Sequence, residues 1–264
     1  ITITDSNMEF GLTPNSDNYA NGLETKADYS SITVKGSDLS GFYYCINLQD
    51  DNTDILVNNS SFSKSEGWAI RKVHDNDSYG DSLRFVESTI TDCSNGIIFE
   101  NFGAKVYVYK SKGIRSGTFL AVERRDPSIY IGRTLIKDGG TPMSTYTSEV
   151  QNGSRFGGSV LIEYSTITGN SGYMTFGSGD EGPVSVTISH SVIKNDQTTE
   201  IRFVANSLSL TYCALEYGDN AIYAPNNSFA DYAFNDLVTN NIFDTDADGR
   251  LDPGSSAVDA GPAN

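Results

Sequence analysis

The sequence predicts an all-β fold, a right-handed parallel β-helix of about nine coils that ends in a C-terminal capping segment. One pattern recurs along the chain: an apolar residue, any residue, a second apolar residue, two further residues and a small side chain. Apolar residues that alternate with a period of two indicate β-strands rather than helices. Recurrence of the whole unit every 22 to 31 residues indicates a solenoid. The small side chains that end the pattern are Ser6, Ser37, Ser60, Ser88, Ser111, Thr134, Ser165, Ser191 and Cys213.

Each repeat is expected to build one coil. Its two apolar residues point inward and stack on those of the next coil, about 4.8 Å away. The two residues before the small side chain interrupt the alternation and predict a corner, after which the small hydroxyl points inward and hydrogen-bonds its stacked neighbours. A further apolar residue follows two positions later, except at Gly113, and a glycine often precedes a second strand, as at Gly67 and Gly117. The hydroxyl column favours this solenoid over a β-sandwich, which the same short strands would also fit.

The predicted organisation is a single domain, with coils over residues 1–223 and a capping segment over residues 224–264. Residues 10–31 lengthen the first coil, and residues 137–159 form a Gly-, Ser- and Thr-rich insertion loop after the sixth. Long insertions on a solenoid commonly carry function or wall a groove. Because the chain opens inside a coil with no capping element, we expect it to be part of a larger multidomain protein.

The charge of the chain argues against several classes of partner. Its formal net charge is −16 over 264 residues, whereas nucleic acid and anionic membrane surfaces both attract basic proteins. No apolar run approaches the length of a transmembrane helix, so membrane insertion is not expected. The three cysteines are odd in number and lie in different columns of the repeat, which argues against a disulfide framework.

The corner position before each small side chain carries the first candidate site. From the fourth coil to the eighth it holds Glu87, Lys110, Arg133, Tyr164 and His190, which the register places in one outward line. The expected substrate-binding side chains beside this line are Arg84, Tyr107, Tyr130 and Glu163. One interpretation is a solvated charged surface on which Glu87 pairs with Lys110. The other is a groove for an acidic or neutral polysaccharide, because aromatic faces pack on sugar rings and arginine pairs with uronate carboxylates.

Carboxylates that follow the second strand of coils two and three form a second candidate site. They are expected to stack at one edge, and the spacing Asp75-x-Asp77-x-x-x-Asp81 suits the oxygen ligands that Ca²⁺ prefers. The expected calcium ligands are Asp50, Asp51, Asp54, Asp75, Asp77 and Asp81. Solvated acids in turns are the alternative. Near the C-terminus, residues 244–249 resemble the opening of a calcium loop, but Ser255 stands at its twelfth position and favours a turn.

The repeats resemble those of the right-handed parallel β-helix proteins of the pectate-lyase superfamily, with Ser or Thr where many members carry an inward Asn ladder. Residues 248–261 are similar to the closing segment of many secreted bacterial β-helix proteins, which implies a secreted or cell-surface location. More distantly, Lys110-Ser111 with Arg133 or Arg124 resembles the chondroitinase B and alginate lyase family. Arg124-Arg125 stands where that family has an Arg-His pair.

Two functions follow from these observations. The first is a polysaccharide lyase that cleaves a uronate-containing glycan by β-elimination, a reaction that needs a base and positive charge near the developing anion. Its catalytic residues would be Lys110 as base, Arg133 as carboxylate clamp, and Tyr164 or His190 as acid for the leaving oxygen. The second is a non-catalytic structural, adhesin or glycan-binding module of a larger secreted protein. A glycoside hydrolase fits poorly, because the carboxylates of Glu87 and Glu163 would lie roughly 14 Å apart.

Overall fold

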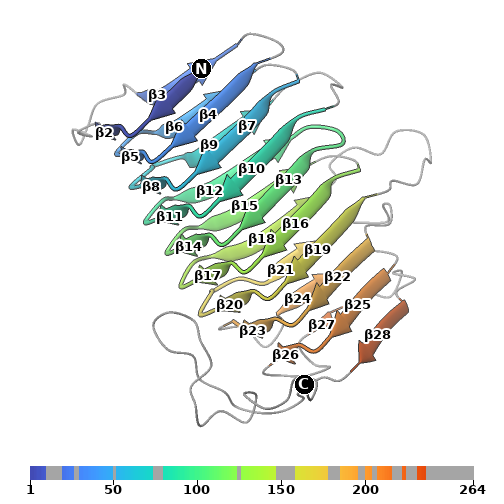
Figure 1. The fold of residues 1–264 in the computed structure, drawn as a ribbon. Coiled ribbons are helices and arrows are strands. Elements are labelled where there is room, and N and C mark those ends of the chain that lie inside the picture. Colours follow the sequence, from blue (N-terminus) through green and yellow to red (C-terminus); the bar gives the residue numbers. More distant parts are fainter. Residues whose placement is uncertain are drawn as a thin grey trace.

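The computed structural model is a column of stacked coils built from β-strands (Figure 1). Every strand pairing between coils is parallel, and the strands form three long sheets, termed here sheets A, B and C. The predicted parallel β-helix is therefore confirmed. Within the described part of the chain, no helix is long and apolar enough to cross a membrane. The structure describes residues 1–9, 20–26, 30–49, 52–73, 80–123, 126–146, 158–177, 185–195, 200–203, 207–215, 222–223 and 231–235.

Each coil contributes one strand to each sheet, so the strand order of a sheet follows the chain in steps of three. Sheet A contains β1 (Thr2–Thr4), β4 (Ser31–Lys35), β7 (Asp54–Asn58), β10 (Ser82–Val86), β13 (Lys105–Tyr109), β16 (Ser128–Gly132), β19 (Ser159–Glu163), β22 (Ser185–Ser189), β25 (Ser207–Thr211) and β28 (Asp231–Asn235). Sheet B contains β2 (Asn7–Glu9), β5 (Asp38–Ser40), β8 (Ser61–Ser63), β11 (Thr89–Thr91), β14 (Lys112–Ile114), β17 (Leu135–Lys137), β20 (Thr166–Thr168), β23 (Val192–Lys194) and β26 (Ala214–Leu215). Sheet C contains β3 (Asn21–Thr25), β6 (Tyr44–Leu48), β9 (Trp68–Val73), β12 (Asn95–Glu100), β15 (Thr118–Glu123), β18 (Thr141–Tyr146), β21 (Met174–Phe176), β24 (Ile201–Phe203) and β27 (Ile222–Tyr223).

The regular body of the solenoid has about seven turns, slightly fewer than the nine coils predicted. The coils from β4–β6 to β22–β24 have neighbours on both sides in all three sheets, whereas the first and last coils are the ends of the stack. Strands also lie within two of the predicted segments. β18 lies inside the predicted insertion 137–159, so part of that segment is regular structure, and residues 147–157 fall outside the described residues. β28 lies within the predicted capping segment 224–264 and extends sheet A by pairing with β25.

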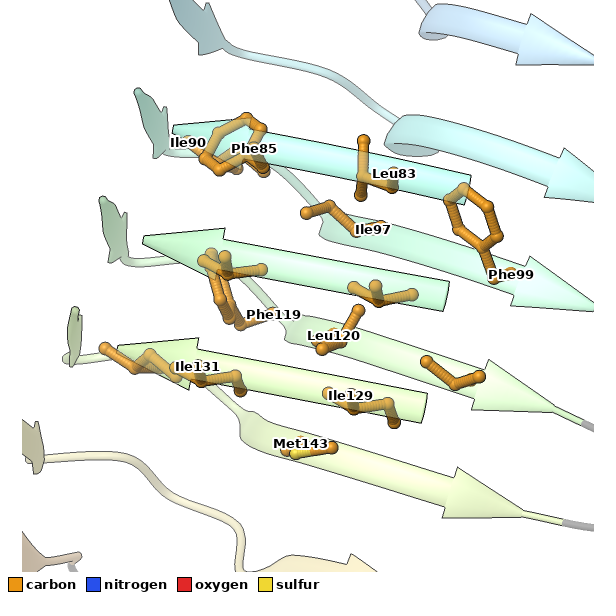
Figure 2. Packing of buried hydrophobic residues seen from close by; sticks show 14 of the residues in the cluster. Leu83, Phe85, Ile90, Ile97, Phe99, Phe119, Leu120, Ile129, Ile131 and Met143 are labelled. Atoms are coloured by element: carbon orange, nitrogen blue, oxygen red, sulfur yellow. The ribbon is translucent and has the colours of Figure 1, made fainter. Parts of the chain in front are cut away.

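The core is the row of inward side chains from the three sheets (Figure 2). Phe119 explains the one gap in the apolar column of sheet B, where Gly113 stands between Ile90 and Ile136. A Cβ atom at Gly113 would lie 2.1 Å from the Phe119 ring, which therefore occupies the space that an isoleucine fills in the neighbouring coils. In the preceding coil the register places Gly96 of sheet C beside Phe119 and Ile90 of sheet B beside Gly113, so there a small residue in sheet C accompanies a larger one in sheet B.

The small residues of the predicted ladder are buried, as expected, except for Ser6 in the first coil. Six ladder hydroxyls both donate and accept a hydrogen bond: those of Ser37, Ser60, Ser88, Ser111, Ser165 and Ser191. Ser165 donates to the Glu163 carbonyl at 2.9 Å and accepts the Thr134 backbone N–H at 3.2 Å. The Ser165 N–H in turn donates to the Ser191 hydroxyl at 3.2 Å. Neighbouring coils are therefore joined from backbone N–H to hydroxyl, and not from hydroxyl to hydroxyl. The sequence predicted the column correctly but not this bonding pattern.

The corner before the ladder has a backbone conformation that the repeat pattern did not reveal. All nine corner residues have φ between 47° and 58°, which is the left-handed region. They are Asp5, Gly36, Asn59, Glu87, Lys110, Arg133, Tyr164, His190 and Tyr212. This conformation costs a non-glycine residue about 1–2 kcal/mol. The parallel ladder continues through the corner and offsets the cost, since the Lys110 N–H donates to the Gly132 carbonyl at 3.0 Å.

The three cysteines are buried and free, which agrees with the prediction that they form no disulfide framework. Cys213 occupies the ladder and makes sulfur contacts with two backbone carbonyls. Burial raises the pKa of the Cys93 thiol to about 11 and also raises the pKa values of Cys45 and Cys213. These cysteines are therefore neutral, space-filling side chains near neutral pH.

Candidate functional site

The predicted outward residues of coils four to nine gather on the outer surface of sheet A and along its corner with sheet B. The register places Arg84, Tyr107 and Tyr130 in one column, and Tyr109 and Glu163 in the next column toward the corner. The corner residues form a third column beside these two. We term this surface the aromatic–basic face. It consists of Arg84, Glu87, Tyr107, Tyr109, Lys110, Tyr130, Arg133, Glu163, Tyr164, His190 and Tyr212.

Two stacked tyrosines are the centre of the face. The rings of Tyr107 and Tyr130 lie 4.9 Å apart at an interplanar angle of 13°. The Arg84 guanidinium lies 5.7 Å from the Tyr107 ring centroid and continues the stack toward the N-terminus. The sequence did not single out Tyr109, whose ring lies 5.9 Å from that of Tyr107. Its position at the end of β13, two residues after Tyr107, is the signal that could have identified it.

Gly132 makes room for the Tyr130 ring. A Cβ atom at Gly132 would lie 2.4 Å from the Tyr130 hydroxyl oxygen, so the ring leans across this glycine toward the corner. Burial raises the pKa of Tyr130, and the negative charge of Glu163 and a hydrogen bond to it raise the pKa further. The Tyr130 hydroxyl therefore stays protonated near neutral pH and donates to the Glu163 carboxylate. Glu163 thus holds a tyrosine of the face in position.

The two cations that were predicted to act together make different contacts. Lys110 Nζ lies 3.3 Å from Glu87 Oε1, and both side chains are about half exposed. Lys110 Nζ also lies 5.6 Å from the Tyr109 ring centroid. The Arg133 guanidinium instead faces the Tyr164 ring at 6.0 Å. The ion pair anticipated by the solvated-surface interpretation is therefore present, and the ammonium has a carboxylate beside it.

Aromatic side chains continue the corner column toward the C-terminus. Tyr164 and His190 are stacked with their centroids 4.7 Å apart, and His190 lies 5.0 Å from Tyr212. Tyr164 is 56% exposed, which makes it one of the few large apolar side chains open to solvent in the described residues. Arg133, Tyr164, His190 and Tyr212 thus form a continuous cationic and aromatic edge across four coils. Such an edge can contact sugar rings and hydroxyl groups while arginine pairs with carboxylates.

The predicted calcium edge is only partly visible. Asp50, Asp51, Asp75 and Asp77 lie outside the described residues. Asp54 is exposed at the start of β7 and accepts a hydrogen bond from the Ser82 hydroxyl at 2.5 Å. Asp81 is fully buried, and its carboxylate contacts Lys72. In the part of the chain that the structure describes, no group of three or more His, Cys, Asp or Glu residues could hold a metal ion.

A second column of corner residues escaped the sequence analysis. Four residues after six of the ladder positions the backbone again has a positive φ, and the four charged residues among them alternate in sign between coils. This column holds Gly41, Lys64, Asp92, Arg115, Asp138 and Gly169. Arg115 donates two hydrogen bonds to the Asp92 carboxylate, at 2.6 and 2.8 Å, and this contact lowers the pKa of Asp92. The constant offset of four residues could have revealed the column.

Arg124, the alternative partner of Lys110 in the lyase resemblance, and Arg125 lie outside the described residues. Comparisons with known proteins add no relative. No protein-family model, curated protein or solved structure matches this chain, so its function has to be inferred from its own residues.

Proposed function

We propose that this chain is an extracellular β-helix module that binds a polysaccharide through the aromatic–basic face. The observation that carries the proposal is the run of stacked rings and arginines on consecutive coils, from Arg84 through Tyr107 and Tyr130 and from Arg133 to Tyr212. Adjacent coils present such groups about every 4.8 Å, which suits a long and regular ligand lying along the solenoid. Tyrosine rings pack against the apolar faces of sugars, and their hydroxyl groups hydrogen-bond to sugar hydroxyls. Such a surface buries apolar area and needs few charged groups.

The arginines of the face support an acidic or neutral glycan as the ligand. The chain carries a net charge of −16 and repels anionic polymers over most of its surface, so an acidic ligand would bind only where arginines are present. On the face, Arg84 and Arg133 contact tyrosine rings and are not paired with a carboxylate in the described contacts. Each guanidinium can therefore offer a fork of donors to a uronate carboxylate.

Binding is favoured over β-elimination because of what surrounds Lys110. A lyase needs a neutral amine as base, assisted by neighbouring positive charge. The Lys110 ammonium instead forms an ion pair with Glu87 on an exposed corner. The proposed role therefore has no chemical step. Lys110 and Glu87 flank the ligand, and the aromatic rings and arginines hold it.

A binding screen against uronate-containing and neutral polysaccharides tests the proposal. Replacing Tyr107 and Tyr130 together by alanine, or Arg133 by alanine, is expected to weaken binding by at least about tenfold, which corresponds to about 1.4 kcal/mol. Tyr223→Ala and Arg202→Ala are matched controls, because these exposed residues lie on sheet C. They are expected to leave binding unchanged. Equal binding by the face variants and the parent protein, or no binding to any glycan, would contradict the proposal.

The same screen distinguishes a lyase from a binding module. Absorbance from unsaturated sugar ends should not appear with any uronate polymer. If such absorbance did appear and Lys110→Ala abolished it while substrate binding persisted, Lys110 would be a catalytic base and the chain a lyase.

A further inference from the structure

A lysine occupies a core position of sheet C. Lys72 lies in β9, and the register pairs it with Leu48 in the coil before and with Phe99 in the coil after. Its side chain is 0% exposed. An amine between two apolar neighbours is cut off from water, and an isolated charge at such a site is strongly unfavourable. The groups around its nitrogen therefore decide what it does.

Asp81 from the following coil meets this amine, and Asn101 of the same coil contacts Asp81. Lys72 Nζ lies 3.4 Å from Asp81 Oδ2, and Asn101 Nδ2 donates a hydrogen bond to the same oxygen. Asp81 Oδ1 accepts the backbone N–H of Thr53 at 2.5 Å, which fixes the carboxylate. Asp81 and Asn101 are 0% and 1% exposed. An amine, a carboxylate and a carboxamide thus share one dry site, with the carboxylate touching both of the other groups.

The geometry points to an intramolecular isopeptide bond between Lys72 Nζ and Asn101 Cγ, formed with Asp81 as the proton carrier. Asp81 takes a proton from the Lys72 ammonium, which leaves a neutral pair in place of two buried charges. The freed nitrogen lone pair attacks Asn101 Cγ, and the Nζ–Cγ bond forms. Asp81 then gives this proton to Nδ2 as the Cγ–Nδ2 bond breaks. It takes the second proton that Nζ loses as the amide forms, so Asp81 ends as a neutral carboxylic acid. Amine and carboxamide become a secondary amide and one molecule of ammonia, with no change of oxidation state.

The carboxamide is the electrophile because the Asp81 carboxyl group lies between the two nitrogens as the proton carrier. Thr53 and Asn101 donate to its two oxygens and Lys72 Nζ lies beside Oδ2, so its contacts position it to pass protons from one nitrogen to the other. The absence of exposed surface at all three side chains also protects the new amide from hydrolysis. The bond would join β9 to the end of β12, two strands that otherwise pair through backbone hydrogen bonds. It would thus bind two neighbouring coils covalently along the solenoid axis.

Intact-mass measurement of the full, denatured chain tests this inference. The expected mass is that of the sequence less one ammonia, and protease digestion should release a branched peptide that joins Lys72 to Asn101. Lys72→Met and Asp81→Asn should both restore the full sequence mass, because they remove the nucleophile and the proton carrier. Lys112→Met, at an exposed lysine of β14, is the matched control and should keep the loss of ammonia.

Three outcomes would overturn the inference. The first is a parent protein with its full sequence mass, a result that does not depend on whether any variant folds. The second is a loss of one water with a branched peptide at Asp81, which would make Asp81 the electrophile. The third is a loss of ammonia that persists in Lys72→Met, which would place the reaction at an asparagine elsewhere in the chain.

Discussion

The ladder hydroxyls show how one small residue can link three neighbouring coils. Ser165 donates to a carbonyl of its own coil, accepts an N–H from the coil before and lies beside the next ladder hydroxyl. It is 2% exposed, so water cannot replace any of these partners. Serine and threonine are therefore selected here for size and for the capacity to donate and accept at once. Cysteine fits at the last position because its sulfur still contacts two carbonyls.

Replacing Ser165 by valine tests the ladder at the level of a single residue. The Thr134 N–H loses its acceptor, while the Ser191 hydroxyl keeps the N–H of residue 165. An orphaned buried donor costs about 1–3 kcal/mol, so the free energy of unfolding should fall by that amount in a denaturant titration. Ser159→Val, at an exposed position of the same strand region, should change it little. Equal midpoints for the two variants would show that the ladder hydrogen bond contributes nothing.

Within one coil, a small residue in one sheet is packed against a large residue in another. The Phe119 ring fills the space over Gly113, whereas the coils on either side place isoleucine at the equivalent position. The small Gly113 in the column of sheet B is thus compensated by the large Phe119 in the column of sheet C of the same coil. Cores that keep their total volume tolerate such exchanges better than single changes of size.

A double-mutant cycle at these two positions measures the exchange. Gly113→Ile alone drives a side chain into the Phe119 ring and should cost about 1–3 kcal/mol. Phe119→Ala alone leaves a cavity and should cost about 3–5 kcal/mol. The double variant restores the pattern of the neighbouring coils, so it should be more stable than the sum of the two single changes predicts, by about 0.5–3 kcal/mol. Additive costs would show that the two residues do not share one space.

The elements also show which features a sequence can reveal. The alternation of apolar residues and the ladder predicted sheet A, because each coil repeats the same short pattern. β18 was assigned to an insertion because Thr141–Tyr146 is rich in polar residues and its pairing comes from neighbouring coils. The outward positions of the aromatic–basic face followed from the register, but the contacts of Lys110 did not. Whether that lysine meets Glu87 or Arg133 depends on side-chain geometry, and the left-handed corner sets that geometry.

At the scale of the whole molecule, a thin solenoid has to accommodate a large negative charge. The net charge is −16, and the core is a single row of side chains, so like charges on neighbouring coils lie close together. Part of this repulsion is offset locally, as in the alternating column where Arg115 pairs with Asp92. The remaining repulsion acts over roughly one Debye length, about 10 Å at 0.1 M salt, and therefore reaches across about two coils.

Salt should therefore stabilise the folded chain, and calcium can be separated from this general effect. Raising the NaCl concentration screens the repulsion, so we expect the Tm to rise and to level off at high salt. CaCl₂ at the same ionic strength gives the same rise if calcium only screens charge. If Asp50, Asp51, Asp54, Asp75 and Asp77, which are the predicted calcium ligands other than the buried Asp81, bind a cation, CaCl₂ should raise the Tm further. A chelator should then reverse the excess, because a ligand that binds only the folded state stabilises it by mass action. Coincident melting curves in the two salts would show that calcium does not bind the folded protein. A Tm that does not change with NaCl would show that the negative charges are already balanced by their neighbours.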